Sequence, residues 1–187
     1  MKRVLLIVSL LMSGAANSQP YASAQLGWAH ADFPLGAPFN GYVRDGGLTY
    51  GVDAGVGFAR VWAAEIGFDG YDSFHGQAIP CPVHTSCAPT ATPQSVNQRL
   101  YDAFAVRRFT IKDVRLFAKA GYYHAKINTD VPLPDAQFTG SGLALGIGLR
   151  WYFTAPWSVS LEATRFDDNV SQIVVGVGWG LGIGERR

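Results

Sequence analysis

The stretch from Gly140 to Phe153, G-S-G-L-A-L-G-I-G-L-R-W-Y-F, alternates large and small side chains over its whole length. Strict alternation of this kind predicts a β-strand. The small face holds mainly glycine and alanine with Arg150, and the large face ends in aromatic residues. The large face is Leu143, Leu145, Ile147, Leu149, Trp151 and Phe153. This pattern is typical of a narrow barrel whose outer surface contacts lipid.

Seven other segments repeat the alternation: 21–33, 48–58, 62–69, 97–109, 114–128, 157–164 and 173–181. Tight turns and longer loops connect them alternately, and the pattern predicts an all-β, eight-stranded antiparallel up-and-down transmembrane β-barrel over residues 19–187. For 97–109 two orientations stay open, since either Phe104 and Val106 or Tyr101, Ala103 and Ala105 could face lipid. A lipocalin-like soluble barrel is the competing fold. It would enclose an apolar cavity, whereas the inward faces here are glycine and charge.

Aromatic residues lie near the ends of these segments, where they would form the two interfacial girdles of a membrane barrel. They are Trp28, Tyr50, Trp62, Trp151, Trp157 and Trp179.

The N-terminus begins with Met1-Lys2-Arg3, a short apolar run and then small residues. This order predicts a secretory signal peptide over residues 1–18. Two of the 15 basic residues lie in it, so the rest of the chain has 13 basic and 14 acidic residues. A nearly neutral chain lacks the basic surface that nucleic-acid binding needs. Aromatic residues at 13% and 22 glycines are many for a soluble domain.

Five charged residues would point into the barrel: Asp53, Glu65, Lys119, Arg150 and Glu162. Because a buried charge is costly unless it is paired, we expect two or three ion pairs across the interior. An interior of eight strands is just wide enough for side chains to fill it. We therefore predict a filled barrel, with a gate or selectivity constriction as the alternative.

The sequence resembles the eight-stranded outer-membrane barrels of the OmpA-like transmembrane domain and OmpX type. The resemblance rests on W-A-A-E-I-G-F-D-G-Y, R-L-F-A-K-A-G-Y, G-L-A-L-G-I-G-L-R-W-Y-F and S-L-E-A-T-R-F. It implies a location in the outer membrane of a Gram-negative bacterium, and Glu65 and Glu162 set against Lys119 and Arg150. The function expected is a structural or surface-interaction role, with a small porin-like channel as the alternative.

A lipid A-modifying enzyme is a second alternative, because His30, Asp72 and Ser73 end two strands on the side of the longer loops. Such a trio could activate a serine. Polar residues are expected at strand ends in any case, and His124 is not followed by a serine two residues later. We predict no catalysis.

The longest predicted loop, residues 74–96, contains Cys81 and Cys87, which we expect to form a disulfide in an oxidising compartment. Adding His75 and His84 would make a metal site, but two cysteines and two scattered histidines are weak support for one. We predict no metal and no cofactor. The expected partners are outer-membrane lipid and lipopolysaccharide, with an extracellular partner at loop 74–96. We expect no nucleic-acid partner and a monomeric chain.

Overall fold

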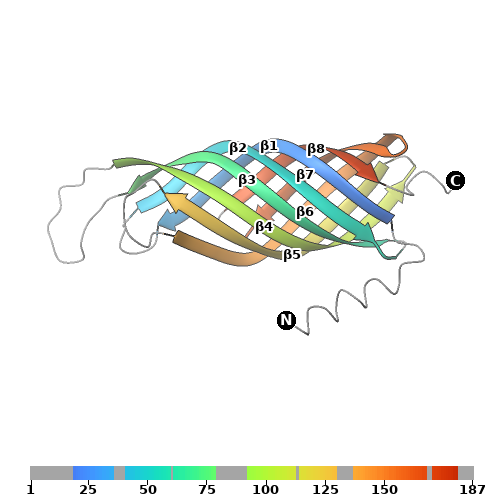
Figure 1. The fold of residues 1–187 in the computed structure, drawn as a ribbon, viewed down its shortest axis with the longest axis horizontal. Helices are drawn as coiled ribbons and strands as arrows, with labels where there is room; N and C mark the ends of the chain where they lie inside the picture. The colour runs from blue at the N-terminus through green and yellow to red at the C-terminus, as the bar shows by residue number, and fades with distance from the viewer. Residues whose placement is uncertain are drawn as a thin grey trace.

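Eight antiparallel strands close into one barrel in the computed structural model (Figure 1). The structure describes residues 19–35, 41–59, 61–78, 92–112, 114–129, 137–167 and 170–180. Each strand pairs with the next along the chain, and β1 pairs with β8 to complete the ring. The strands are β1 Gln19–Leu35, β2 Gly41–Gly57, β3 Trp62–Ala78, β4 Thr92–Ile111, β5 Val114–Thr129, β6 Gln137–Thr154, β7 Trp157–Phe166 and β8 Val170–Gly180. The predicted fold is confirmed.

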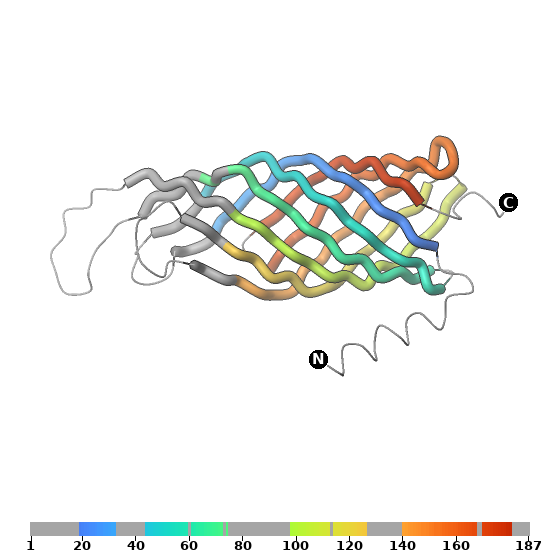
Figure 2. Tube along the Cα trace, viewed as in Figure 1, coloured from blue at the N-terminus to red at the C-terminus, as the bar shows by residue number. Residues whose placement is uncertain are grey.

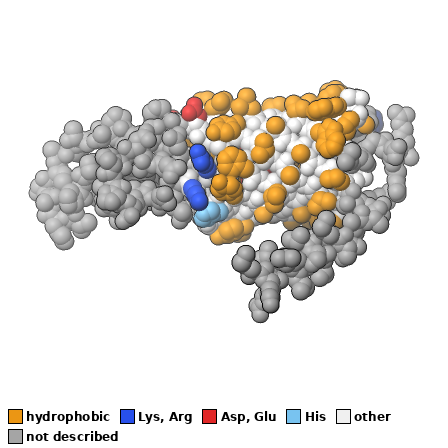
Figure 3. Space-filling model, in the orientation of Figure 1, with side chains coloured by type: hydrophobic (Ala, Val, Ile, Leu, Met, Phe, Trp, Pro, Cys, Tyr) orange, Lys and Arg blue, Asp and Glu red, His pale blue; other side chains and the backbone are white. Residues whose placement is uncertain are grey.

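The outer wall is apolar because alternate side chains of every strand point away from the barrel axis. In Figure 3, hydrophobic side chains cover the wall between the two ends of the barrel. On β6 all six side chains of the large face of the Gly140–Phe153 stretch are exposed. The six aromatic residues predicted for the girdles are all exposed on this wall. No helix among the described residues is long and apolar enough to cross a membrane.

The two ends of the barrel differ in how the strands are connected. Short turns join β2 to β3, β4 to β5 and β6 to β7 at one end (Figure 2). At the other end β1 meets β2, β3 meets β4, β5 meets β6 and β7 meets β8. In outer-membrane barrels the short turns face the periplasm and the longer loops face outward. By this rule we expect the end with the longer connections to face outward, and we call it the extracellular edge.

The predicted loop 74–96 is wrong at both of its ends. β3 continues to Ala78 and β4 begins at Thr92, with Phe74 opposite Val96 and Ala78 opposite Thr92. The connection is therefore 79–91. Outside the lipid, backbone hydrogen bonds are enough to hold a strand pair together, and the outward side chains need not be apolar. The apolar alternation therefore stops before the strands end. The side chains of β4 are also resolved: Phe104 and Val106 point inward, whereas Tyr101, Ala103 and Ala105 point outward.

Two predictions concern residues outside the described part of the chain. They are the signal peptide over residues 1–18 and the disulfide between Cys81 and Cys87, and both stay predictions. The alternative metal site also depends on Cys81, His84 and Cys87, which lie outside the described residues.

Closure of the barrel depends on a glycine at the seam between β1 and β8. Gly27 lies opposite Val174, and a Cβ at Gly27 would lie 2.6 Å from the Val174 Cα. A backbone atom this close cannot move aside as the end of a flexible side chain can. We expect Gly27→Ala to lower the free energy of unfolding by about 1–3 kcal/mol, the usual cost of overpacking. The measurement is urea unfolding of the refolded protein in phospholipid vesicles.

The matched control is Gly140→Ala on β6, because no atom lies within 4 Å of a Cβ at that position. It should change stability by less than about 0.5 kcal/mol, as an uncrowded substitution does. Equal effects of the two substitutions would contradict the close approach at the seam.

Candidate functional site

Three of the five charges predicted for the interior form one cluster, which we call the ionic layer: Glu65 of β3, Lys119 of β5 and Glu162 of β7. All three are buried. Lys119 Nζ lies 3.4 Å from Glu65 Oε1 and forms a second ion pair with Glu162. The remaining carboxylate oxygen of Glu65 accepts a hydrogen bond of 2.9 Å from the Tyr21 hydroxyl. A single cation thus links carboxylates from two other strands across the barrel.

Arg150, also predicted for this network, makes no ion pair with a described carboxylate. Its guanidinium carbon lies 4.8 Å from the centre of the Tyr21 ring and 5.8 Å from that of Phe117. Stacking on aromatic faces suits guanidinium because it is planar and weakly hydrated. Arg150 therefore packs beside the ionic layer, on the side nearer the short turns. It does not form a second ionic link between strands, as Lys119 does.

Asp53 and two carboxylates that the predicted site did not include, Asp69 and Asp102, are buried inside the barrel. Gln25 Nε2 lies 3.5 Å from Asp53 Oδ1 and 3.2 Å from Asp69 Oδ1, so one amide joins both acids. Gln172 donates to the second oxygen of Asp69 at 3.3 Å. Asp69 lies on the same face of β3 as Glu65, so the alternation of the sequence could have identified it. Asp102 lies on β4, for which the sequence left two orientations open.

The middle of the interior is rich in carboxyl groups as a result. They belong to Asp53, Glu65, Asp69, Asp102 and Glu162, and Lys119 is the buried lysine among them. Asp102 Oδ1 has no hydrogen-bond partner among the described residues. Nearer the short turns, Arg108, Arg115 and Arg150 line the interior. Acidic and basic side chains therefore lie at different levels of the barrel.

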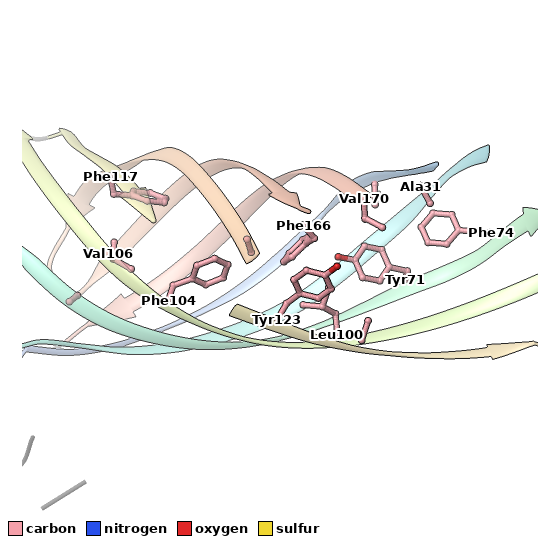
Figure 4. Packing of buried hydrophobic residues seen from close by; sticks show 14 of the residues in the cluster. Ala31, Tyr71, Phe74, Leu100, Phe104, Val106, Phe117, Tyr123, Phe166 and Val170 are labelled. Carbon is pink, nitrogen blue, oxygen red and sulfur yellow. The ribbon is translucent and has the colours of Figure 1, made fainter. Parts of the chain in front are cut away.

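A second cluster fills the half of the barrel nearer the extracellular edge, and we call it the aromatic layer. Its members come from five strands and point toward one another (Figure 4). The Tyr123 and Phe166 rings meet edge to face at 5.5 Å, and Phe166 is 1% exposed. The members are Tyr71, Phe74, Leu100, Tyr123, Phe166 and Val170. The Tyr71 hydroxyl donates to Gln172 Oε1 at 3.0 Å, which connects this layer to Asp69.

The rim residues of the enzyme alternative lie on separate strands. His30 is exposed on β1 and Asp72 is exposed on β3, with β2 between them. Ser73 belongs to β3, and its side chain is outside the described part. The described residues thus do not bring the predicted trio together. They also contain no group of three or more His, Cys, Asp or Glu arranged to hold a metal ion.

A different pair of polar side chains meets on the outer wall. His124 Nδ1 of β5 lies 2.8 Å from Ser141 Oγ of β6, and both residues are exposed. A serine within hydrogen-bond reach of a histidine is the first requirement for an activated nucleophile. No carboxylate among the described residues is hydrogen-bonded to His124 to orient it. This geometry favours polar binding over catalysis.

A closed barrel of eight antiparallel strands, with an apolar outer wall and buried charged side chains inside, defines a transmembrane barrel of the outer-membrane class. The chain belongs to the outer membrane protein beta-barrel domain family, whose model matches residues 4–180. Its location is therefore the outer membrane of the cell. No curated protein matches the chain in sequence.

Several solved structures share the fold. Neisserial surface protein A is 14% identical, with a TM-score of 0.58, and the match covers 87% of this chain and 96% of that one. OprG from Pseudomonas aeruginosa is 10% identical, with a TM-score of 0.55 and coverages of 88% and 96%. Ail, the attachment invasion locus protein of Yersinia pestis, crystallised with the heparin analogue sucrose octasulfate, is 16% identical, with a TM-score of 0.53 and coverages of 86% and 98%. At these identities the likeness concerns the fold.

Proposed function

We propose that this protein is a closed outer-membrane barrel whose role is to present its extracellular edge and loops to partners, without a transmembrane pore and without catalysis. The aromatic layer is the observation that carries the proposal. Phe74, Leu100 and Phe166 are almost completely buried inside the barrel. Interiors packed to this degree hold few voids larger than a water molecule.

The ionic layer supports closure at a second level. Lys119 reaches across the interior to Glu65 and Glu162, so a permeating ion would have to separate both pairs. Nearer the short turns, Tyr21, Phe117 and Arg150 line a cavity of about 10 Å³. That volume is at the lower limit for one water molecule.

A small channel is the second candidate, and the carboxyl groups around Lys119 favour it. If the two layers separated, these groups would attract cations to the middle of the interior. Closed and open forms would then differ by the rupture of the Lys119 pairs. The two candidates thus differ in whether the interior of the resting protein is closed or open to ions.

Presentation of loops is the role expected when the barrel itself is rigid and closed, because binding residues are concentrated on loops held by a scaffold. The barrel proteins with a similar fold include Ail, the attachment invasion locus protein of Yersinia pestis. We propose that the connection 79–91, between the ends of β3 and β4, contacts an extracellular partner. We also propose that the protein is monomeric and that it contacts outer-membrane lipid and lipopolysaccharide.

The test is replacement of residues 79–91 by a short Gly/Ser turn in bacteria that display the protein. We expect the shortened barrel to fold normally, because Ala78 and Thr92 already pair at its edge. Adhesion to a panel of immobilised host glycans and matrix glycoproteins should fall to the level of bacteria without the protein. A matched replacement of residues 130–136, between β5 and β6, is the control. Unchanged adhesion of the 79–91 variant would contradict the role of this connection.

A further inference from the structure

Two basic side chains face each other on the outer wall near the extracellular edge. Arg99 of β4 pairs directly with Lys126 of β5, and both side chains are exposed. Like charges directly opposite each other destabilise a strand pair. No acidic side chain among the described residues forms an ion pair with either of them. An anion held between the two would remove the repulsion.

Hydrogen-bonding side chains lie next to this basic pair, one step closer to the membrane. Tyr101 and His124 are the next outward residues on β4 and β5, and they pair with each other. Ser141, bonded to His124, extends the polar patch onto β6. In Figure 3, basic side chains and a histidine gather at one end of the apolar wall. The basic pair and these three residues form what we call the edge site.

An apolar groove lies further along the same strands. Its volume is about 930 Å³, and it crosses the outer wall between larger side chains. Its lining includes Ala105, Ala118, Ala120, Leu145, Ile147 and Ala163. Small alanine side chains on β4 and β5 next to leucine and isoleucine on β6 produce the depression.

The distance between the basic pair and the groove fits one leaflet of a membrane. Ala120 and Lys126 point outward from the same strand, six residues apart, which is about 20 Å along a strand. Because strands of such barrels tilt by about 35–45°, the depth is roughly 15 Å. That is half of the ~30 Å hydrocarbon core. A headgroup at the edge site would therefore place its acyl chain along the groove.

We propose that the edge site and the groove together bind one phosphorylated glycolipid of the lipid A type. Its phosphate lies between Arg99 and Lys126, its sugar hydroxyls meet His124 and Ser141, and an acyl chain lies in the groove. The amphiphile is favoured over a free anion because the apolar groove continues the basic pair. The assignment deepens the proposed contact with outer-membrane lipid and rests on the proposed outward orientation of this edge.

The experiment uses the full refolded protein in phosphatidylcholine vesicles that contain a minor fraction of lipid A. The protein is extracted in mild detergent, and mass spectrometry measures the ratio of lipid A to phosphatidylcholine that stays bound. We expect enrichment of lipid A. Arg99→Gln with Lys126→Gln should reduce the enrichment by roughly fivefold for each charge removed, the usual effect of a basic residue at an anionic surface.

The matched control for charge is Arg44→Gln. Arg44 is exposed on β2 near the same edge and pairs with Asp32 at 3.3 Å. Its loss should leave the enrichment unchanged. For the groove, Ala120→Phe should lower the enrichment, whereas Ala54→Phe, in a second outer groove, should not. All five substituted positions point outward, so each variant should keep the shift in gel mobility that marks a folded barrel.

Several outcomes would overturn the proposal. One is equal enrichment in the wild type and the Arg99/Lys126 variant, and another is equal enrichment of lipid A whose phosphates have been removed. Displacement by inorganic phosphate would assign the site to a free anion. Equal retention of phosphatidylglycerol would assign it to anionic lipids in general. None of these outcomes depends on whether the barrel conducts, so failure here is separable from failure of the closed-barrel proposal.

Discussion

Lys119→Met is expected to lower the free energy of unfolding by about 3–5 kcal/mol, the cost of removing one partner from a buried ion pair. The substitution leaves Glu65 and Glu162 buried without their shared cation. The methionine fills most of the lysine's volume, so the loss reports on charge and not on a cavity. Urea unfolding in phospholipid vesicles measures the change.

Two further variants make this result specific. Lys126→Met removes an exposed lysine from the same strand and should change the free energy of unfolding by less than about 0.5 kcal/mol. The triple variant Lys119→Met, Glu65→Gln, Glu162→Gln should recover most of the loss, because neutral replacement of a whole buried cluster is often close to neutral. A Lys119→Met protein as stable as the Lys126→Met protein would contradict the ionic layer.

Phe166→Ala should lower the free energy of unfolding by a similar amount, because it disrupts the aromatic layer. The Phe166 ring is 1% exposed and meets Tyr123 edge to face. Truncation of a buried phenylalanine typically costs about 3–5 kcal/mol, through lost burial and the cavity that stays behind. The same unfolding measurement applies. Because Phe166 and Lys119 lie in different layers, the two losses should be nearly additive.

Phe166→Leu is the matched control for this position. It keeps an apolar side chain of similar size and should cost less than about 1.5 kcal/mol. An equal loss for Phe166→Leu and Phe166→Ala would show that ring geometry, and not filling of the interior, stabilises this half of the barrel.

Sequence alternation was sufficient to predict the barrel because the two faces of each strand lie in different environments. One face contacts lipid and the other packs into the barrel interior. The stretch from Gly140 to Phe153 carries this signal most strongly, and its large side chains lie on the outer wall as expected. The same rule placed Glu65 and Lys119 on inward faces. Their pairing depends on the tilt and stagger of strands, and the alternation of a single strand does not contain it.

The rest of the site escaped prediction for identifiable physical reasons. β4 carries apolar side chains on both faces, since Phe104 belongs to the interior while Tyr101 faces outward, and Asp102 was missed with it. The strand ends around residues 74–78 and 92–96 lie past the apolar belt, so they resemble a loop. His124 and Ser141 are neighbours only across a strand pair, which a search for closely spaced residues along the chain does not detect.

Single-channel conductance of the refolded protein in a planar lipid bilayer tests the closed interior most directly. The expected result is silence from wild-type protein whose folding has been verified, and openings only when Leu100→Ala, Phe166→Ala and Lys119→Met are combined to remove both layers. Because this variant lacks Lys119 and keeps the carboxyl groups around it, those openings should prefer cations. Discrete openings of the wild type, altered in size by Lys119→Met alone, would contradict the closed barrel and make the ionic layer the lining of a pore.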